Sequence, residues 1–530
     1  MSFSRICRLL FRWVALWAGL SVFACSGHAA DAVWQWSVPL GEGRAFLWIP
    51  GDCRQVRAVV VGQHNMIEQG ILEHPAMRRT LAELGIAEVF IAPPLDRPFE
   101  FDKGAGERFD AMMRALADES GYDELATAPV APMGHSACAS FPWNFAAWAP
   151  QRTLAVLSVK GDAPQTNLTG SGAPNPDWGT RTIEGIPGLF VMSEQEWWED
   201  RLTPLLKFRE AHPATPLAVL CDTGHGHFDA TDELVEFLAM FIRKAVAARL
   251  PDLTAVGGAL RPDSQTQNEH RGVKPLLQPI DPARGWLAGR WRREAAQRPA
   301  APAPANEYHG DPAEAFWCFD EEMARATDAY QTRGHGKQIQ QLDFVQAGEL
   351  ATINTRTGIE LKFLPDADGL TFRLTGDFIA PLPPRPPTAA KDNHKLPPPT
   401  SRVPDRAAPG AHADGAVQIL AITGPVEQLS ADTFRVTFNR TSSTTDKRDH
   451  DIWFVALHPG DAAYKGAVQQ ALLRLPKFTE GAPQAITFPA IPDQRAGIAT
   501  VPLAAVSDAG LPVGYYVREG PAFVRDGVLH

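Results

Sequence analysis

The chain has 530 residues, a formal net charge of -11 and 21% charged residues. A single hydrophobic core stops growing near roughly 250 to 300 residues, so this length predicts at least two domains. The acidic balance excludes the strongly basic surface that nucleic-acid binding requires, and we expect no nucleic-acid partner.

The first 30 residues have the pattern of a secretory signal peptide. Three arginines precede an apolar stretch over residues 13–24, and small residues follow as far as Ala30. The apolar stretch is short for a bilayer span, and no later segment is apolar enough to cross one. We therefore expect a secreted or periplasmic protein. Cys25 follows a small residue, which leaves a lipoprotein anchor as the alternative, although Phe23 fits that pattern poorly.

Residues 31–255 predict an α/β domain. Eight short apolar runs alternate with amphipathic stretches of helical period, and from the third onward the runs are continuously apolar. Such strands are covered on both faces, as in a doubly wound, mostly parallel sheet. The expected strands are residues 33–38, 45–49, 56–62, 87–93, 128–133, 153–159, 188–193 and 216–221.

The chain changes character after this domain. Residues 256–310 lose the periodicity and contain the Pro/Ala tract PAAPAPA, which predicts a linker or irregular segment. Residues 311–480 begin with one expected helix, AEAFWCFDEEMARATDAYQ, and continue as alternating short strands that predict a mainly β, Ig-like sandwich. A Pro-rich insert at 381–415 interrupts these strands and cannot build a core.

Residues 481–530 contain AGLPV and GPA turns between short apolar segments. This pattern resembles the start of bacterial Ig-like modules. It covers only the end of the chain, so we expect an incomplete module there.

Four cysteines remain once the leader is removed. An exported protein tolerates disulfides, and the cysteine spacing matches no zinc pattern. We therefore expect no metal and favour free thiols, with disulfides as the alternative. These residues are Cys53, Cys138, Cys221 and Cys318.

GHSACASFPW, at residues 134–143, follows an apolar run and precedes a helical one. A strand, a sharp turn and a helix with serine at the apex form a nucleophile elbow. Gly134 and Ser136 fit its G-x-S pattern. Cys138 stands where glycine is usual, and it is small enough for the helix to pack against the strand.

A serine nucleophile needs a base, which is expected after the last strand. The segment DTGHGHFDATDEL offers His225 and His227 there. Gly-His-Phe ahead of a long amphipathic helix favours His227, and His225 is the alternative that would line the mouth of the site.

The acid that orients this histidine should follow the preceding strand. Glu196 stands three residues after Ser193, which closes that strand, and is our candidate, with Glu194 as the alternative. An acidic helix start, favoured by the helix dipole, is the competing interpretation of both residues.

The oxyanion hole should combine two backbone N–H groups. One belongs to Ala137, the residue after the serine. The second should come from the loop GQHNM after the third strand, which makes His64 or Asn65 the donor.

Ser136, Glu196 and His227 stand in the serine, acid, histidine order of α/β-hydrolases. Residues 33–250 resemble a secreted bacterial α/β-hydrolase of the esterase and lipase superfamily. The resemblance implies hydrolysis of carboxylic esters through an acyl-enzyme, without a cofactor.

The substrate is less well indicated. Aromatic rings suit sugars and phenolic acids, so the four tryptophans near the site, Trp143, Trp148, Trp197 and Trp198, suggest carbohydrate or plant-wall esters, although this spacing is also typical of a core. Small esters and polyesters are alternatives. Two other functions compete: a non-catalytic hydrolase-like protein that binds cell-wall polysaccharide, and a serine peptidase on the same fold. The oligomeric state stays open.

Overall fold

The computed structural model forms two compact units, one over Trp36–Gln484 and one that joins Ala485–His530 to Trp34 and Gln35. The predicted signal peptide with Cys25, Trp197 and most of the Pro-rich insert lie outside the described residues. The structure describes residues 34–170, 172–196, 198–250, 276–293, 298–354, 358–380, 410–438, 441, 449–476, 481–495 and 500–530.

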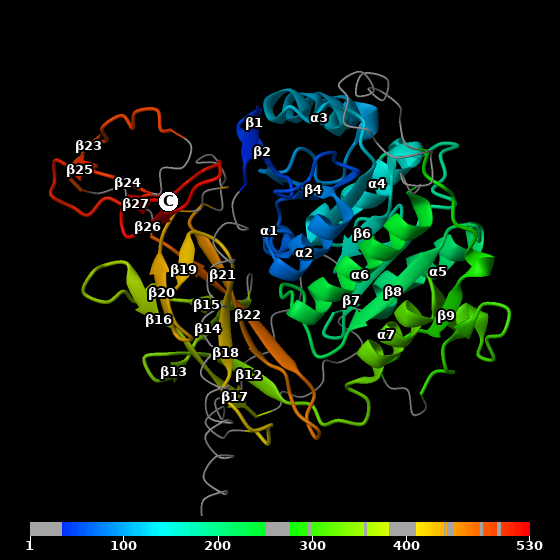
Figure 1. The fold of residues 1–530 in the computed structure, drawn as a ribbon. Helices are drawn as coiled ribbons and strands as arrows, with labels where there is room; N and C mark the ends of the chain where they lie inside the picture. Colours follow the sequence, from blue (N-terminus) through cyan, green and yellow to red (C-terminus); the bar gives the residue numbers. More distant parts are fainter. Residues whose placement is uncertain are drawn as a thin grey trace, which may run out of the picture. The chain divides into compact units, whose positions relative to one another are not determined.

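The larger unit is built on an eight-stranded sheet with the strand order β1-β2-β4-β3-β5-β6-β7-β8 (Figure 1). β1 pairs antiparallel with β2, and β2 pairs antiparallel with β4, whereas every neighbouring pair from β4 to β8 is parallel. This is the expected α/β-hydrolase sheet, so the fold prediction is confirmed. The strands are β1 (Trp36–Leu40), β2 (Gly43–Trp48), β3 (Ala58–Gln63), β4 (Ile86–Ala92), β5 (Val130–His135), β6 (Val156–Val159), β7 (Gly188–Ser193) and β8 (Leu217–Asp222).

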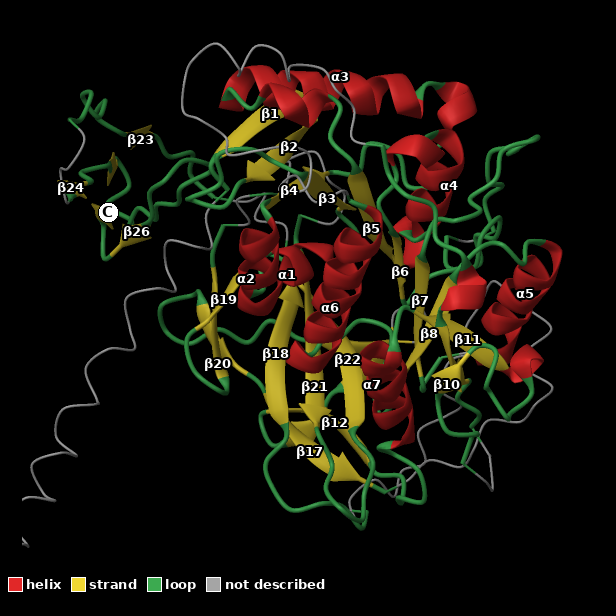
Figure 2. Ribbon diagram, turned by 45° about the vertical axis from the view of Figure 1, so that its right-hand side comes forward, coloured by secondary structure: helices red, strands yellow, loops and turns green. Residues whose placement is uncertain are grey.

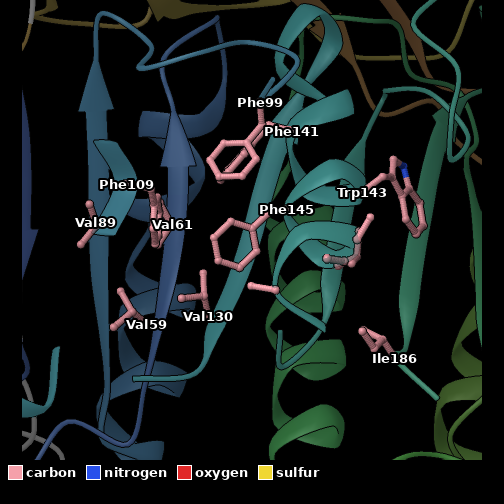
Figure 3. Packing of buried hydrophobic residues seen from close by; sticks show 14 of the residues in the cluster. Val59, Val61, Val89, Phe99, Phe109, Val130, Phe141, Trp143, Phe145 and Ile186 are labelled. Carbon is pink, nitrogen blue, oxygen red and sulfur yellow. The ribbon is translucent and has the colours of Figure 1, made fainter. Parts of the chain in front are cut away.

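Helices cover both faces of this sheet (Figure 2). On one face, side chains from three helices share a core with alternate strand residues such as Val59 and Val61 (Figure 3). Strand side chains alternate between faces, so the intervening Val60 points to the other side, where α2 and α6 pack together. The helices are α1 (Glu68–Leu72), α2 (Pro75–Leu84), α3 (Ala105–Ser120), α4 (Ser140–Trp148), α5 (Trp198–Ala211) and α6 (Asp232–Arg249).

An aromatic cluster joins α3 and α4 on one face of the sheet (Figure 3). Phe99, Phe109 and Phe145 are fully or almost fully buried, and each contributes roughly 1.5 to 3 kcal/mol by leaving water. Trp143 is also buried, and its indole N–H donates to the carbonyl of Asp162 at 2.7 Å. Trp148 packs on Phe145. Trp143 is therefore a core residue, and the idea that it offers a face to a ligand is wrong.

The predicted helix over residues 313–331 is correct only in its second half. Ala315–Cys318 form strand β11, which pairs with β9 (Trp286–Gly289) inside the stretch expected as a linker, and β9 also pairs with β10 (Ala303–Pro304). Helix α7 then spans Glu321–Thr332, because the side chain of Asp320 accepts a hydrogen bond from Met323 N–H and caps it.

The rest of this unit is mainly β, as expected. A five-stranded sheet and two three-stranded sheets bury one hydrophobic cluster that includes Phe344, Phe372 and Phe454. Its Ig-like character stays a prediction. The strands are β12 (Gln341–Gln346), β13 (Glu349–Leu350), β14 (Thr352–Asn354), β15 (Gly358–Leu361), β16 (Thr371–Arg373), β17 (Thr375–Ile379), β18 (Gln418–Thr423), β19 (Val426–Gln428), β20 (Thr433–Val436), β21 (Asp451–His458) and β22 (Ala467–Arg474).

The smaller unit has strands of two residues each, and the Ig-like module expected at 481–530 stays a prediction. They are β23 (Ile486–Thr487), β24 (Val501–Pro502), β25 (Val506–Ser507), β26 (Val524–Arg525) and β27 (Val528–Leu529). Over the described part of the chain, no helix has the length and apolar character to cross a bilayer. Cys53, Cys138, Cys221 and Cys318 are free thiols.

Candidate active site

Ser136 stands on a strained turn between β5 and α4. Its φ of 52° lies in the left-handed region, which costs energy for any residue with a side chain. Gly134 makes the turn feasible, because a Cβ at this position would lie 2.0 Å from the carbonyl oxygen of Cys138. The chain therefore folds here as the nucleophile elbow that the G-x-S pattern predicts.

The structure brings Ser136, His227 and Glu196 together. His227 Nε2 lies 2.7 Å from Ser136 Oγ, and its Nδ1 lies 2.9 Å from Glu196 Oε2. In this geometry Nδ1–H donates to the carboxylate, which leaves Nε2 to accept the serine proton. The three groups thus form one chain of hydrogen bonds from the nucleophile to the acid.

Glu196 is buried yet strongly favours its ionised form. Burial alone would raise the pKa of Glu196, but the charges of Arg201 and His227, and then Lys160, lower it below its usual range. The Arg201 guanidinium contacts Glu196 Oε2 directly and has no exposed surface. The acid is therefore held as a carboxylate largely by Arg201 and Lys160, whose side chains are fully buried.

The alternative residues belong to the scaffold around the site. His225 Nδ1 pairs with Asp229 Oδ2 at 2.5 Å. Glu194 Oε2 accepts from Gly224 N–H at 2.9 Å, and its Oε1 pairs with Lys465 at 2.6 Å. Both residues support the loop that carries His227.

Lys160 also anchors the loop that carries His227. It is fully buried at the end of β6, with Nζ 3.0 Å from Asp222 Oδ2 and 3.2 Å from Asp229 Oδ1. It also donates to the carbonyl of Gly226 at 2.7 Å, one residue before His227. Burial would lower the pKa of Lys160, but the two aspartates raise it, so the ammonium stays charged.

The Lys160 ammonium also bears on whether three nearby residues could bind a metal ion. Asp222, His225 and Asp229 offer ligand atoms within 4.8 Å of one another. The nitrogen of Lys160 already lies between the two carboxylates as their cation. A divalent ion would have to displace it, so these residues do not fit a metal site.

His135, the middle residue of G-x-S, contacts both the loop after β3 and the loop that carries His227. Its Nε2 donates to the carbonyl of His227 at 2.8 Å, and its Nδ1 accepts from Asn65 Nδ2 at 3.3 Å. Burial and the neighbouring His227 lower the pKa of His135 well below its usual value, so it is the neutral imidazole that makes both contacts.

The predicted oxyanion donors on the loop after β3 have other partners, and that part of the prediction is wrong in this structure. His64 N–H donates to the carbonyl of Ile91 at 2.8 Å. Asn65 N–H donates to Glu68 Oε2 at 3.1 Å. Ala137 N–H has no hydrogen-bond partner among the described residues and stays available to an oxyanion.

Glu68 explains why this loop differs from the prediction. Its carboxylate also accepts from Met66 N–H at 2.8 Å and from His135 N–H at 3.0 Å. Burial raises the pKa of Glu68 to about 7, against the lowering effect of these backbone donors. The carboxylate therefore ties the loop after β3 to the strand that carries Ser136.

Two of these supporting residues can be located from the sequence, although neither is among the site residues predicted above. Lys160 directly follows the apolar run TLAVLSV, and Asp222 directly follows PLAVLC. Parallel strands end at one edge of the sheet, so opposite charges at those positions would meet. Arg201 and Glu68 lie within helices and have no comparable signal.

No family model and no curated protein matches the chain. A dienelactone hydrolase from Anabaena variabilis is 17% identical, with 41% of this chain and 96% of that chain covered and a TM-score of 0.27. Est1E from Butyrivibrio proteoclasticus is 14% identical, with 40% and 99% covered and a TM-score of 0.27. An S-formylglutathione hydrolase from Agrobacterium tumefaciens is 14% identical, with 41% and 94% covered and a TM-score of 0.29. At this level of similarity these proteins assign no reaction or substrate to the chain.

Proposed function

We propose that the chain is a serine hydrolase that cleaves carboxylic esters through an acyl-enzyme. One observation carries the proposal: His227 joins the Ser136 hydroxyl at 2.7 Å to the Glu196 carboxylate at 2.9 Å. Ser136 sits on a strained elbow, which supports the same role. A serine aligned in this way with an ionised acid is an activated nucleophile.

The geometry suggests the order of proton transfers. Ser136 Oγ attacks the ester carbonyl while His227 Nε2 takes its proton, and Glu196 stabilises the imidazolium that forms. The N–H of Ala137 donates to the developing oxyanion. His227 then protonates the leaving alcohol. Water, deprotonated by the same nitrogen, releases the acid and restores Ser136.

The proposal also covers the substrate and the location of the protein. We propose that it is secreted or periplasmic and that its substrate is an ester of a polymer or of a small molecule. The burial of Trp143 removes one of the observations that favoured carbohydrate or plant-wall esters. Contact with cell-wall polysaccharide through the β-rich region stays an untested alternative.

A fluorophosphonate probe tests the nucleophile. We expect the wild-type protein to be labelled at Ser136 and the Ser136→Ala variant to be unlabelled. Ser140→Ala is the matched control, since Ser140 lies four residues away and its hydroxyl donates to the carbonyl of Thr166. Equal labelling of both variants, or none of the folded wild type, would overturn the proposal.

The reaction class needs a second measurement. Hydrolysis of a p-nitrophenyl ester series, set against a peptide anilide series, separates an esterase from a peptidase. We expect turnover of esters that disappears in His227→Ala and persists in His225→Ala, because His225 pairs with Asp229 rather than with Ser136. Preferred turnover of anilides would assign the site to a peptidase.

A further inference from the structure

The loop that carries His227 contacts residues far outside the α/β domain. It begins at Asp222, where β8 ends. The hydroxyl of Tyr330, on α7, donates to Asp222 Oδ1 at 2.8 Å, and Arg333, directly after α7, donates to the carbonyl of Thr223 at 2.8 Å. The start of the loop is therefore held by a helix that follows the α/β domain in the chain.

Lys465 reaches the middle of the same loop from the β-rich region, residues 341–474. Its Nζ lies 2.6 Å from Glu194 Oε1, and Glu194 Oε2 accepts from Gly224 N–H at 2.9 Å. Both side chains of this pair are largely buried, with exposed fractions of 18% for Lys465 and 10% for Glu194. One carboxylate thus connects the lysine to the backbone three residues before His227.

The backbone of Lys465 is itself fixed. Its N–H donates to the carbonyl of Gln338 at 2.8 Å, and its carbonyl accepts from Gln340 Nε2 at 2.7 Å. The next residue, Gly466, lies against Gly224, since a Cβ on Gly224 would come within 3.0 Å of Gly466 Cα. The two loops therefore pack closely, and Lys465 presents its ammonium from a defined position.

Glu194 also joins the segment of the proposed acid to the loop of the proposed base. Its backbone N–H donates to the carbonyl of Asp222 at 3.1 Å, while its side chain binds the N–H of Gly224. Glu196 stands two residues further along the same segment. The position of Glu196 relative to His227 therefore depends on how Glu194 is held.

We propose that Lys465 is a positioning residue of the Ser136 site, whose ammonium holds Glu194 and thereby keeps the His227 loop in place against Glu196. This inference rests on the proposed function, because it concerns the geometry of that triad. A largely buried carboxylate without its cation is unfavourable, so Glu194 would turn toward water and release Gly224 N–H. The β-rich region is then part of the catalytic unit.

Steady-state ester hydrolysis by the full-length protein tests this role. Lys465→Met removes the charge and keeps most of the side chain. We expect kcat to fall by about tenfold or more and KM to change by less than about twofold, because a small displacement of His227 slows the chemical step without weakening binding. Lys465→Arg retains the cation and should keep kcat within about threefold of wild type.

The matched control is the same substitution at another lysine of the β-rich region. Lys362 is exposed, so Lys362→Met should change kcat and KM by less than about twofold. Titration of active sites with a fluorophosphonate gives kcat per competent site, and thermal unfolding verifies that each variant is folded.

A double-mutant cycle shows whether Lys465 acts through Glu194. Glu194→Ala removes the carboxylate and should itself lower kcat by about tenfold or more, since Gly224 N–H loses its acceptor. In that background Lys465→Met should change kcat by less than about twofold, because the lysine no longer holds anything.

Four results would overturn the inference: equal kcat in Lys465→Met and Lys362→Met, a change in KM alone, a loss of kcat that Lys465→Arg shares, and multiplying effects in the double variant. Labelling of wild-type Ser136 and turnover of esters by the wild type test the proposed function separately. If the wild type is labelled and active but Lys465→Met equals its control, only this inference fails.

Discussion

Glu196 and Glu68 are two buried carboxylates in the site around Ser136, and their pKa values are shifted in opposite directions. Burial raises the pKa of both groups. Glu196 contacts Arg201 and lies in the field of Lys160, and these cations lower its pKa below the usual range. Glu68 accepts only backbone N–H groups, and its pKa remains raised to about 7. Since both carboxylates are buried, the cations beside Glu196 account for the difference between these two groups.

The difference in pKa matches the role of each carboxylate. The proposed acid must be an anion to stabilise a protonated His227. Glu68 has only to hold the N–H groups of Asn65, Met66 and His135 in place. One side of the site is thus held by buried ion pairs and the other by hydrogen bonds to a carboxylate that titrates near neutrality.

Removing the Lys160 ammonium, which anchors the loop that carries His227, should have the largest effect. Lys160→Met leaves Asp222 and Asp229 buried without their ammonium, and breaking such a pair costs about 3 to 5 kcal/mol. We expect that loss in the free energy of unfolding, and a fall of about a hundredfold or more in ester hydrolysis by the folded fraction, because Gly226 loses its anchor. Denaturant unfolding and active-site titration measure the two effects.

Lys244→Met is the matched control for that variant. Lys244 also pairs with two carboxylates, Asp320 and Glu322, but these are largely exposed. Surface pairs are worth about 0 to 1 kcal/mol, so this variant should lose little stability and no activity. Similar losses in both variants would show that burial of the Lys160 cluster has no special role.

Removing Arg201 from beside Glu196 should raise the pKa of Glu196, so that it resembles Glu68. In Arg201→Met the pKa of Glu196 should rise, since the strongest of its neutralising charges is lost while burial remains. A depressed pKa stabilises the fold above the pKa of the unfolded state, and this contribution is lost as pH falls through the folded pKa. We therefore expect both activity and stability of the variant to fall at higher pH than in the wild type on acidification.

The pH–rate profile of Arg201→Met between about pH 4 and 8 measures this shift. Arg209→Met, on the same helix, is the control, because Arg209 donates to the carbonyl of Ala315 and not to the triad. An Arg201→Met profile lowered equally at every pH would mean that Arg201 acts only by packing.

Replacing Glu68 with glutamine should change the pH dependence of stability by a smaller amount and in the opposite direction. A raised pKa means that the stabilising contribution of Glu68 is complete below pH 4.5 and is lost as pH rises through about 7. Wild type should therefore lose about 2 to 3 kcal/mol more stability than Glu68→Gln between about pH 5 and 8. Glu88, whose pKa burial raises to about 8, adds the same trend to both proteins and cancels in the difference.

Urea unfolding at several pH values tests this prediction. Glu107→Gln, at an exposed position on α3, should follow the wild-type pH dependence. If Glu68→Gln retains the full wild-type loss of stability, Glu68 does not titrate in this range.

The sequence was sufficient for the sheet, the elbow and the three proposed triad residues, because each depends on local pattern. Continuous apolar runs predicted β3 to β8, and residue order along the chain predicted which strand ends meet. The oxyanion donors failed for a non-local reason: Glu68, on the following helix, folds back onto the N–H of Asn65. The start of α7 failed because Ala315–Cys318 pair with β9, and pairing between distant segments overrides a helical pattern.

Aromatic packing also supports the loop that carries His227, and the smallest predicted effect tests this contact. Phe228, next to His227, packs against Trp453 of β21 with ring centroids 5.2 Å apart. Such a pair is worth about 0.5 to 1.5 kcal/mol beyond its area. Trp453→Leu should therefore lower kcat/KM by about two- to tenfold while leaving the pH dependence assigned to Glu68 unchanged. A double-mutant cycle with Phe228→Leu should return a coupling energy in that range. Additive effects of the two substitutions would show that the β-rich region does not act on His227 through this contact.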